Sequence, residues 1–203
     1  MADTKEEAKK ESTCKVVEMR NAEDWSTRGI NADTAGNYTF AIDALSKSIE
    51  LNPDEPLTYY NRGIVYDRIG QYELAIEDFN TFLSMEPHDV DAFYNRGRTF
   101  VNLGQYKNAI ADFNRVIFLD PEYSEAYNNR GVVYDSMGQY KRAIEDYNEA
   151  IRLKPDLARA YCNRGGVYFK QGNNRLGCID AKTAYELGDN ELLEWARTKG
   201  FLV

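Results

Sequence analysis

The chain has 203 residues, of which 43% are hydrophobic and 29% charged, so it can bury a sizeable core in one or two domains. Its formal net charge of −8 argues against a nucleic-acid partner, because binding to phosphate backbones requires clustered Lys and Arg. No apolar run approaches the roughly 18 residues that span a bilayer, and the first ten residues lack the apolar segment of a secretory signal. We therefore expect a folded protein that is neither inserted in a membrane nor exported.

The first predicted element is a tail at residues 1–21. It carries five basic and five acidic residues and few large apolar ones. Segments of this composition bury too little apolar surface to offset the entropy of ordering. We expect the tail to be largely disordered.

A period of 34 residues organises the chain after the tail. The segments that begin at Tyr59, Phe93 and Tyr127 align without gaps. Extending this frame gives five units, at 22–55, 56–89, 90–123, 124–157 and 158–191, of which the second and fourth share 16 of 34 residues. Self-similarity at a fixed period of this length is typical of a repeat architecture.

Each unit is predicted to be a hairpin of two helices, with Gly and Pro at fixed positions counted from the start of the unit. Position 8 is Gly in all five units, within a helical pattern where Gly is destabilising by about 1 kcal/mol unless two backbones approach closely. Position 15 is also Gly in all five units, which suits the left-handed residue that closes a helix. Pro at position 32 in four units predicts the end of the second helix, because Pro disfavours helix in the residue before it.

Large apolar residues recur within every unit at helical spacing. Positions 4 and 11 are mostly aromatic, and positions 21, 24 and 30 of the second predicted helix are mostly apolar. A single hairpin cannot bury all of these side chains, but stacked hairpins bury them between neighbours. The sequence therefore predicts a continuous core that runs through five stacked units.

This pattern of aromatic, Gly, Ala and Pro positions resembles the tetratricopeptide repeat over residues 22–191. The resemblance implies an all-α fold, a right-handed α-solenoid of stacked helix-turn-helix hairpins. Both end units depart from the pattern, as terminal repeats do. Trp195 falls at position 4 of a would-be sixth unit, so we interpret residues 192–203 as a capping helix and the C-terminus.

The resemblance also implies a concave groove, built from first-helix positions 2, 5, 6, 9, 12 and 13, that binds an extended peptide or a partner helix. Position 6 places four primary amides in this groove, which we call the asparagine ladder: Asn61, Asn95, Asn129 and Asn163. Each amide offers two N–H donors and one C=O acceptor, so it can bond the main chain of an extended segment without reading side chains. The sequence thus predicts an adaptor for protein partners. The alternative is that these amides contact the next helix or water.

Aromatic and charged residues flank the asparagine ladder. Tyr60 and Tyr94, at position 5, provide contact area of the kind that concentrates binding energy at interfaces, or they pack between adjacent first helices. Arg98 and Arg159 are basic groove residues, whereas the acidic groove residues gather toward the first four units. A ligand could therefore lie with its basic end near the first units, unless these charges only face solvent.

A partial carboxylate clamp is a minor alternative. Some family members use such a clamp to hold the acidic C-terminus of a chaperone, and four residues resemble it: Arg98, Asn129, Arg159 and Asn163. Tyr94 stands where the clamp has Lys, so the match is incomplete.

Arginine occupies position 7 in all five units, and Asp occupies position 23 in the last four. A row of arginines could bind anions. A bidentate guanidinium–carboxylate pair between the two helices of one unit explains both positions together, so we predict a structural role. In the first unit, Arg28 would face Ala44 instead.

Few residues are suited to catalysis or metal binding. Cys14, Cys162 and Cys178 form no C-x-x-C pair, which fits a reducing, cytoplasmic compartment. Cys178 takes a position that is Ile in the other units, so we expect it to be buried. The single histidine, His88, lies in a predicted turn without a neighbouring nucleophile. We expect no catalytic residue, no metal ion and no cofactor.

The alternative function is a structural scaffold that self-associates as a homo-oligomer. Its contacts would come from the exposed last repeat and C-terminus, through Tyr185, Phe201 and Leu202. An enzyme is the third and weakest hypothesis.

Overall fold

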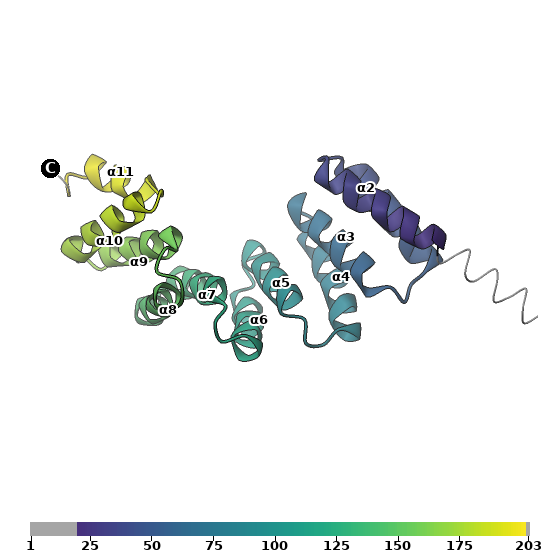
Figure 1. The fold of residues 1–203 in the computed structure, drawn as a ribbon. Helices are drawn as coiled ribbons and strands as arrows, with labels where there is room; N and C mark the ends of the chain where they lie inside the picture. Colours follow the sequence, from purple (N-terminus) through teal and green to yellow (C-terminus); the bar gives the residue numbers. More distant parts are fainter. Residues whose placement is uncertain (1–19, 202–203) are drawn as a thin grey trace, which may run out of the picture. The chain divides into compact units, whose positions relative to one another are not determined.

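The structure is a computed structural model that describes residues 20–201, all of whose regular elements are helices. The chain divides into two compact units, Met1–Thr99 and Phe100–Val203. Each unit is described by itself below. Figure 1 shows the helices in chain order.

The first unit contains two helix hairpins and most of a following helix. The first hairpin joins a helix at residues 20–34 to α2 (Tyr38–Leu51), and the second joins α3 (Pro56–Arg68) to α4 (Tyr72–Met85). Helix α5 (Val90–Asn102) begins in this unit. The helices therefore alternate as first and second members of the predicted repeats.

The second unit continues the same pattern. It contains α6 (Tyr106–Leu119), α7 (Ser124–Ser136), α8 (Tyr140–Leu153), α9 (Ala158–Lys170), α10 (Asn174–Glu186) and α11 (Glu191–Thr198). Helix α11 packs against α10 and α9. The Trp195 ring on α11 meets Phe169 of α9 with ring centroids 5.1 Å apart, so this short helix covers the end of the last hairpin.

The glycines at position 15 adopt the predicted left-handed conformation. Their φ angles lie between 70 and 77° at Gly36, Gly70, Gly104, Gly138 and Gly172. At the turn from α3 to α4, Gly70 N donates to Asp67 O (3.1 Å) and Gln71 N donates to Tyr66 O (2.9 Å). These bonds satisfy carbonyls at the end of α3, which would otherwise lack partners.

The glycines at position 8 lie where two helices of one hairpin approach closely. A Cβ atom on Gly63 would stand 3.1 Å from Phe79 Cε1, and one on Gly131 would stand 2.7 Å from Tyr147 Cε1. The predicted close approach is confirmed in both units. Any larger residue at Gly131 would have to displace the buried Tyr147 ring.

The core is made of small clusters that join successive hairpins. In the first unit, Ala41 and Leu45 of α2 cluster with Val65 of α3. In the second, Ala143 and Tyr147 of α8 cluster with Val167 of α9. Each cluster takes residues from two successive repeats, so hairpins share a core within each unit. The predicted all-α fold of stacked hairpins is confirmed.

The two ends of the chain were the least regular part of the sequence pattern. Residues 1–19 of the predicted tail lie outside the described residues, whereas Arg20 and Asn21 belong to the first helix. At the other end, α11 begins at Glu191, one residue before the predicted capping segment. Leu202 and Val203 also lie outside the described part of the chain.

Candidate functional site

Two members of the asparagine ladder border separate surface hollows in the first unit. Hollow A, of about 430 Å³, lies against the helix at 20–34 and α3, and Asn61 is among its lining residues. Hollow B, of about 340 Å³, takes its lining from α3, α4 and α5, and Asn95 is among them. Both asparagines are partly exposed, so both amides can meet a ligand.

Asn95 is held in place by Tyr60 of the preceding repeat. Its Nδ2 donates to Tyr60 Oη at 2.8 Å. The Tyr60 ring packs against Phe79 and Phe82, with ring centroids 5.9 and 5.1 Å apart. Burial, assisted by the charges of Asp91 and Asp89, raises the pKa of Tyr60, so its hydroxyl stays protonated. Tyr60 thus packs between helices and also orients an amide of the ladder.

In the second unit, an asparagine performs the role of Tyr60. Asn163 Nδ2 donates to Asn128 Oδ1 at 3.0 Å, and Asn128 Nδ2 donates to Asn129 Oδ1 at 3.3 Å. Asn128 stands at position 5, the same position as Tyr60. The amides of Asn129 and Asn163 are therefore connected through one side chain on α7.

These bonds leave part of the Asn95 and Asn163 amides available. Asn95 and Asn163 each use one of two N–H donors, and a primary amide also has a carbonyl acceptor. Asn61 makes no hydrogen bond with its side chain to any other described residue. Contact with a neighbouring first helix, here that of the preceding repeat, is thus observed, and at Asn95 and Asn163 it coexists with free hydrogen-bonding groups.

Two of the acidic groove residues pair with a cation of the following repeat, and a third accepts a hydrogen bond from a neutral hydroxyl. Asp33 accepts two hydrogen bonds from Arg68 at 2.8 and 2.9 Å, and Asp135 accepts two from Lys170 at 2.8 and 2.7 Å. Asp67 accepts from Thr99 Oγ1 at 2.8 Å. The gradient of charge along the groove is therefore weaker than a count of charged residues indicates.

The remaining predicted site residues are Tyr94, Arg98 and Arg159. Tyr94 is half-buried on α5, and the two arginines are exposed. Arg98 borders hollow B and belongs to the first unit, whereas Arg159 belongs to the second. The carboxylate clamp, which needs residues of both units, stays a prediction.

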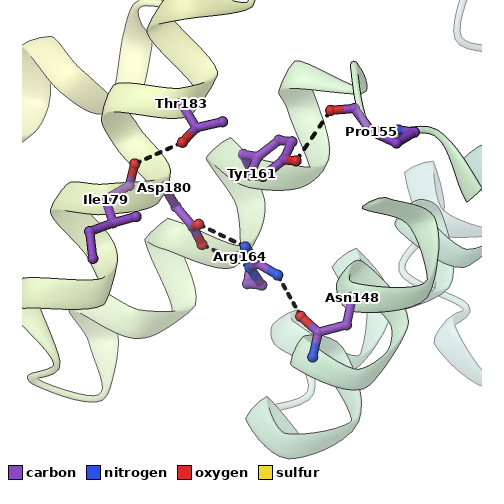
Figure 2. A network of polar contacts seen from close by, with 7 residues as sticks. All are labelled: Asn148, Pro155, Tyr161, Arg164, Ile179, Asp180 and Thr183. Atoms are coloured by element: carbon purple, nitrogen blue, oxygen red, sulfur yellow. Dashed lines mark hydrogen bonds and ion pairs between the residues drawn. The ribbon is translucent and has the colours of Figure 1, made fainter. Parts of the chain in front are cut away.

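The predicted pairs of Arg at position 7 with Asp at position 23 are confirmed in both units. Arg164 donates from Nε and Nη2 to the two carboxylate oxygens of Asp180, each at 2.8 Å, as Figure 2 shows. The same bidentate geometry joins Arg62 to Asp78 and Arg130 to Asp146. Hydrogen bonds to the carboxylates raise the pKa of Arg62 and Arg164 against the opposing effect of burial.

A third partner of these arginines was missed in the sequence analysis. Arg164 Nη1 donates to Asn148 Oδ1 of the preceding repeat at 2.6 Å (Figure 2), and Arg130 Nη1 donates to Asn114 at 2.6 Å. The signal was present, because position 25 is Asn in the second, third and fourth units. The guanidinium groups of Arg62, Arg130 and Arg164 therefore each join two repeats as well as two helices, which favours the structural role over anion binding.

In the first repeat a different contact replaces the Arg–Asp pair, and the cysteines and His88 complete the sequence-predicted residues. Arg28, whose unit has Ala44 at position 23, pairs with Asp24 on its own helix at 2.7 Å. Cys178 is half-buried, so the expectation of a fully buried side chain was wrong, and its Sγ donates to Phe201 O at 3.4 Å. Burial, assisted by Asp189, raises the pKa of Cys162 to about 11, so this thiol is not activated. Cys14 lies outside the described residues, and His88 is exposed.

Two features of the described residues bear on other functions. None of the helices within residues 20–201 is long and apolar enough to cross a membrane. The same residues contain no group of three or more His, Cys, Asp or Glu side chains arranged to hold a metal ion.

Known proteins resemble the chain in sequence and in fold. A model of the TPR repeat matches residues 97–138 and 134–172, and a model of the tetratricopeptide repeat matches residues 41–92. A crystal structure of MamA is 31% identical, with 84% of this chain and 96% of that chain aligned and a TM-score of 0.73. A second MamA crystal structure is 30% identical, with 90% and 97% aligned and a TM-score of 0.75.

YrrB, described as a TPR protein with an unusual peptide-binding site, shares the fold. It is 22% identical, with 86% of this chain and 90% of that chain aligned and a TM-score of 0.70. No curated protein matches the sequence significantly. The repeat models and the MamA similarity agree with the hairpins described above, and the chain belongs to the tetratricopeptide repeat family.

Proposed function

We propose that the chain is a non-catalytic adaptor that binds an extended segment of a partner protein through the asparagine ladder. Membership of a family of generally non-catalytic interaction proteins supports an adaptor in general terms. The observation that favours main-chain binding is that Asn61 and Asn95 each border a surface hollow and keep free donors and acceptors. The peptide-binding site named for YrrB supports the same kind of ligand.

The contact between Asn95 and Tyr60 favours binding rather than opposing it. A side chain that is already held in one orientation loses less conformational entropy when a ligand arrives. The bond to Tyr60 fixes one N–H of Asn95, so the second N–H and the carbonyl point away in defined directions. These two groups match the C=O and N–H of an extended peptide.

A peptide-binding experiment tests this proposal. Peptides are first selected from a random display library, with the full chain as the target. The double variant Asn61→Ala with Asn95→Ala should bind the selected peptides at least tenfold more weakly, because two amides that hold the main chain are removed. N-methylation of the peptide at one central residue should weaken binding by a similar factor. Fluorescence anisotropy measures both effects.

The matched control replaces two asparagines on second helices. Asn108 and Asn174 are exposed on α6 and α10, and the double alanine variant at these positions should bind as the wild type does. Circular dichroism checks that helicity is unchanged. If the variant at positions 61 and 95 binds the peptides as tightly as the control, the ladder does not hold the ligand.

Self-association is the second candidate, because apolar side chains remain exposed near the C-terminus. Ile179 is 50% exposed, Tyr185 52%, Trp195 41% and Phe201 38%. Light scattering over a range of concentrations measures the mass of the wild type and of Phe201→Asp. A concentration-dependent oligomer that is lost in the variant would support a scaffold. A constant monomer mass would contradict it.

Binding of a partner's C-terminal carboxylate stays a minor proposal. It is supported by the exposed Arg159, which precedes Asn163 by four residues on α9. Selected peptides with a free C-terminus and with an amidated C-terminus distinguish it from main-chain binding. Equal affinity for the two forms would contradict the clamp. The cytoplasmic location stays a prediction from the cysteine pattern.

A further inference from the structure

Hollow A in the first unit carries negative charge without a counter-charge. Its lining includes Glu23 and Glu55 and no Lys, Arg or His. Neither carboxylate forms an ion pair with another described residue, whereas Asp24, next to Glu23, is paired with Arg28. A ligand group that enters this hollow therefore meets two carboxylates that lack cationic partners.

A buried hydroxyl beside the hollow also lacks a partner. Thr58 borders hollow A and is 0% exposed, and its Oγ1 makes no hydrogen bond within the described structure. Thr58 lies three residues before Asn61 on α3, so the two side chains share one face of the helix. Unsatisfied buried polar groups are rare in native proteins and call for a ligand, a water or an ion.

The walls of hollow A are partly apolar. Ile30 and Leu57, which are 42% and 57% exposed, also line it. Alkyl walls beside carboxylates and an amide suit a side chain with an aliphatic stem and a cationic head. Lys and Arg have this structure. Their N–H groups can donate hydrogen bonds to carboxylate, amide and hydroxyl oxygens.

Hollow B, in the same unit, has the opposite character. Two arginines, Arg68 and Arg98, line it together with Asp67. Arg68 is bound to Asp33 and Asp67 accepts from Thr99, so Arg98 is the lining charge that has no partner among the described residues. The two hollows therefore differ in the side chains that they can accept.

We propose that hollow A binds a Lys or Arg side chain of the segment that the asparagine ladder holds. The proposal rests on the adaptor function and adds the chemistry of one ligand residue. The cationic head lies between Glu23 and Glu55 with Asn61 and Thr58 beneath it, and the stem packs on Ile30 and Leu57. The main chain of the ligand then continues toward hollow B.

A small probe tests hollow A without the rest of a peptide. Nα-acetyl-lysine methylamide is titrated into the 15N-labelled full chain, with the norleucine and glutamate analogues as neutral and acidic probes. The lysine probe should shift the backbone signal of Thr58 and the side-chain signal of Asn61. The norleucine and glutamate probes should bind at least fivefold more weakly, and 0.5 M NaCl should weaken the binding of lysine.

The variant that tests the charges is Glu23→Gln with Glu55→Gln. It should bind the lysine probe at least fivefold more weakly than the wild type. The matched control, Glu73→Gln with Glu77→Gln, makes the same change in net charge on α4 in the same unit, and it should bind as the wild type does. Equal loss in both variants would mean that net charge alone attracts the probe, which would overturn the proposal.

Two further outcomes would also overturn it. One is that norleucine binds as tightly as lysine, which would make hollow A an apolar site. The other is that replacing Lys5, Lys9, Lys10 and Lys15 by Gln shifts the Asn61 signal without any probe, which would assign hollow A to the chain's own N-terminal segment. Failure of this test leaves the amide variants at positions 61 and 95 as a separate test of the adaptor.

Discussion

The hairpin of α3 and α4 in the first unit and the hairpin of α7 and α8 in the second use the same positions for different side chains. Position 5 is Tyr60 in one and Asn128 in the other, and position 24 is Phe79 in one and Tyr147 in the other. In both, the residue at position 5 accepts a hydrogen bond from the asparagine at position 6 of the following repeat. The pair of positions is retained although its chemistry changes.

Each hairpin has one tyrosine at the positions just compared, Tyr60 in the first and Tyr147 in the second. Only the hydroxyl of Tyr60 has a hydrogen-bond partner. Tyr60 Oη accepts from Asn95, whereas Tyr147 is 0% exposed and its hydroxyl has no hydrogen-bond partner in the structure. Burial, followed by the charges of Asp135 and Asp146, raises the pKa of Tyr147. The phenol of Tyr60, on a first helix, thus orients an amide of the asparagine ladder, and the phenol of Tyr147, in the core, contributes only its ring.

Both hairpins contain a bidentate Arg–Asp pair, and breaking this pair should give the largest change in the free energy of unfolding. Asp78→Ala and Asp146→Ala each leave a partly buried guanidinium without its carboxylate. Each should lower the free energy of unfolding by about 3 kcal/mol, the lower end of the range for a broken buried pair, because the arginines keep 19% and 18% of their side-chain surface exposed. Urea unfolding followed by circular dichroism measures both.

Two exposed aspartates give the control for these variants. Asp54 and Asp156 stand at position 33 of their units, in turns, and their alanine variants should change the free energy of unfolding by no more than about 0.5 kcal/mol. A loss under 1 kcal/mol in Asp146→Ala, with the full loss in Asp78→Ala, would show that the two hairpins are not equivalent.

The difference between the hairpins predicts a smaller effect of opposite sign. Tyr147→Phe removes a buried hydroxyl that has no partner, so it should raise the free energy of unfolding by about 1 kcal/mol. The reverse change, Phe79→Tyr, should lower it by a similar amount, because it buries a new hydroxyl. Destabilisation by Tyr147→Phe would mean that the hydroxyl is hydrogen-bonded in solution.

Most of the fold could be predicted, because several of its turns and close helix contacts each require one particular residue type at a fixed position of the repeat. Gly at position 15 is required by a positive φ, and Gly at position 8 is required by a neighbouring ring, as at Gly63 and Phe79. The Arg–Asp pairs could be predicted because both partners recur 16 residues apart. Such local and repeated constraints leave a direct record in the sequence.

The candidate site was harder to predict because its contacts join repeats that differ. Asn95 bonds Tyr60, and Asn163 bonds Asn128, so no single residue type at position 5 marks the contact. The ion pairs of Asp33 and Asp135 with the next repeat were hidden for the same reason, since position 13 is Arg, Asn, Ser or Lys in the four later units. Fixed spacing revealed the scaffold, whereas the surface of each repeat has its own residues.

These surface pairs give the smallest predicted effect. Asp33 binds Arg68 in the first unit and Asp135 binds Lys170 in the second, with Arg68 and Lys170 about half exposed at 48% and 51%. Double-mutant cycles with Asn and Gln should give a coupling free energy of about 0.5 kcal/mol for each pair. The two couplings should be similar, because each cation reaches its carboxylate through a single nitrogen, Arg68 Nη1 in one pair and Lys170 Nζ in the other. At 1 M NaCl, where screening acts over about 3 Å, both couplings should fall toward zero. A coupling that persists in high salt would show that the pair is shielded from solvent, and Asp33 and Asp135 would then stay neutralised more firmly than the exposed surfaces of Arg68 and Lys170 indicate.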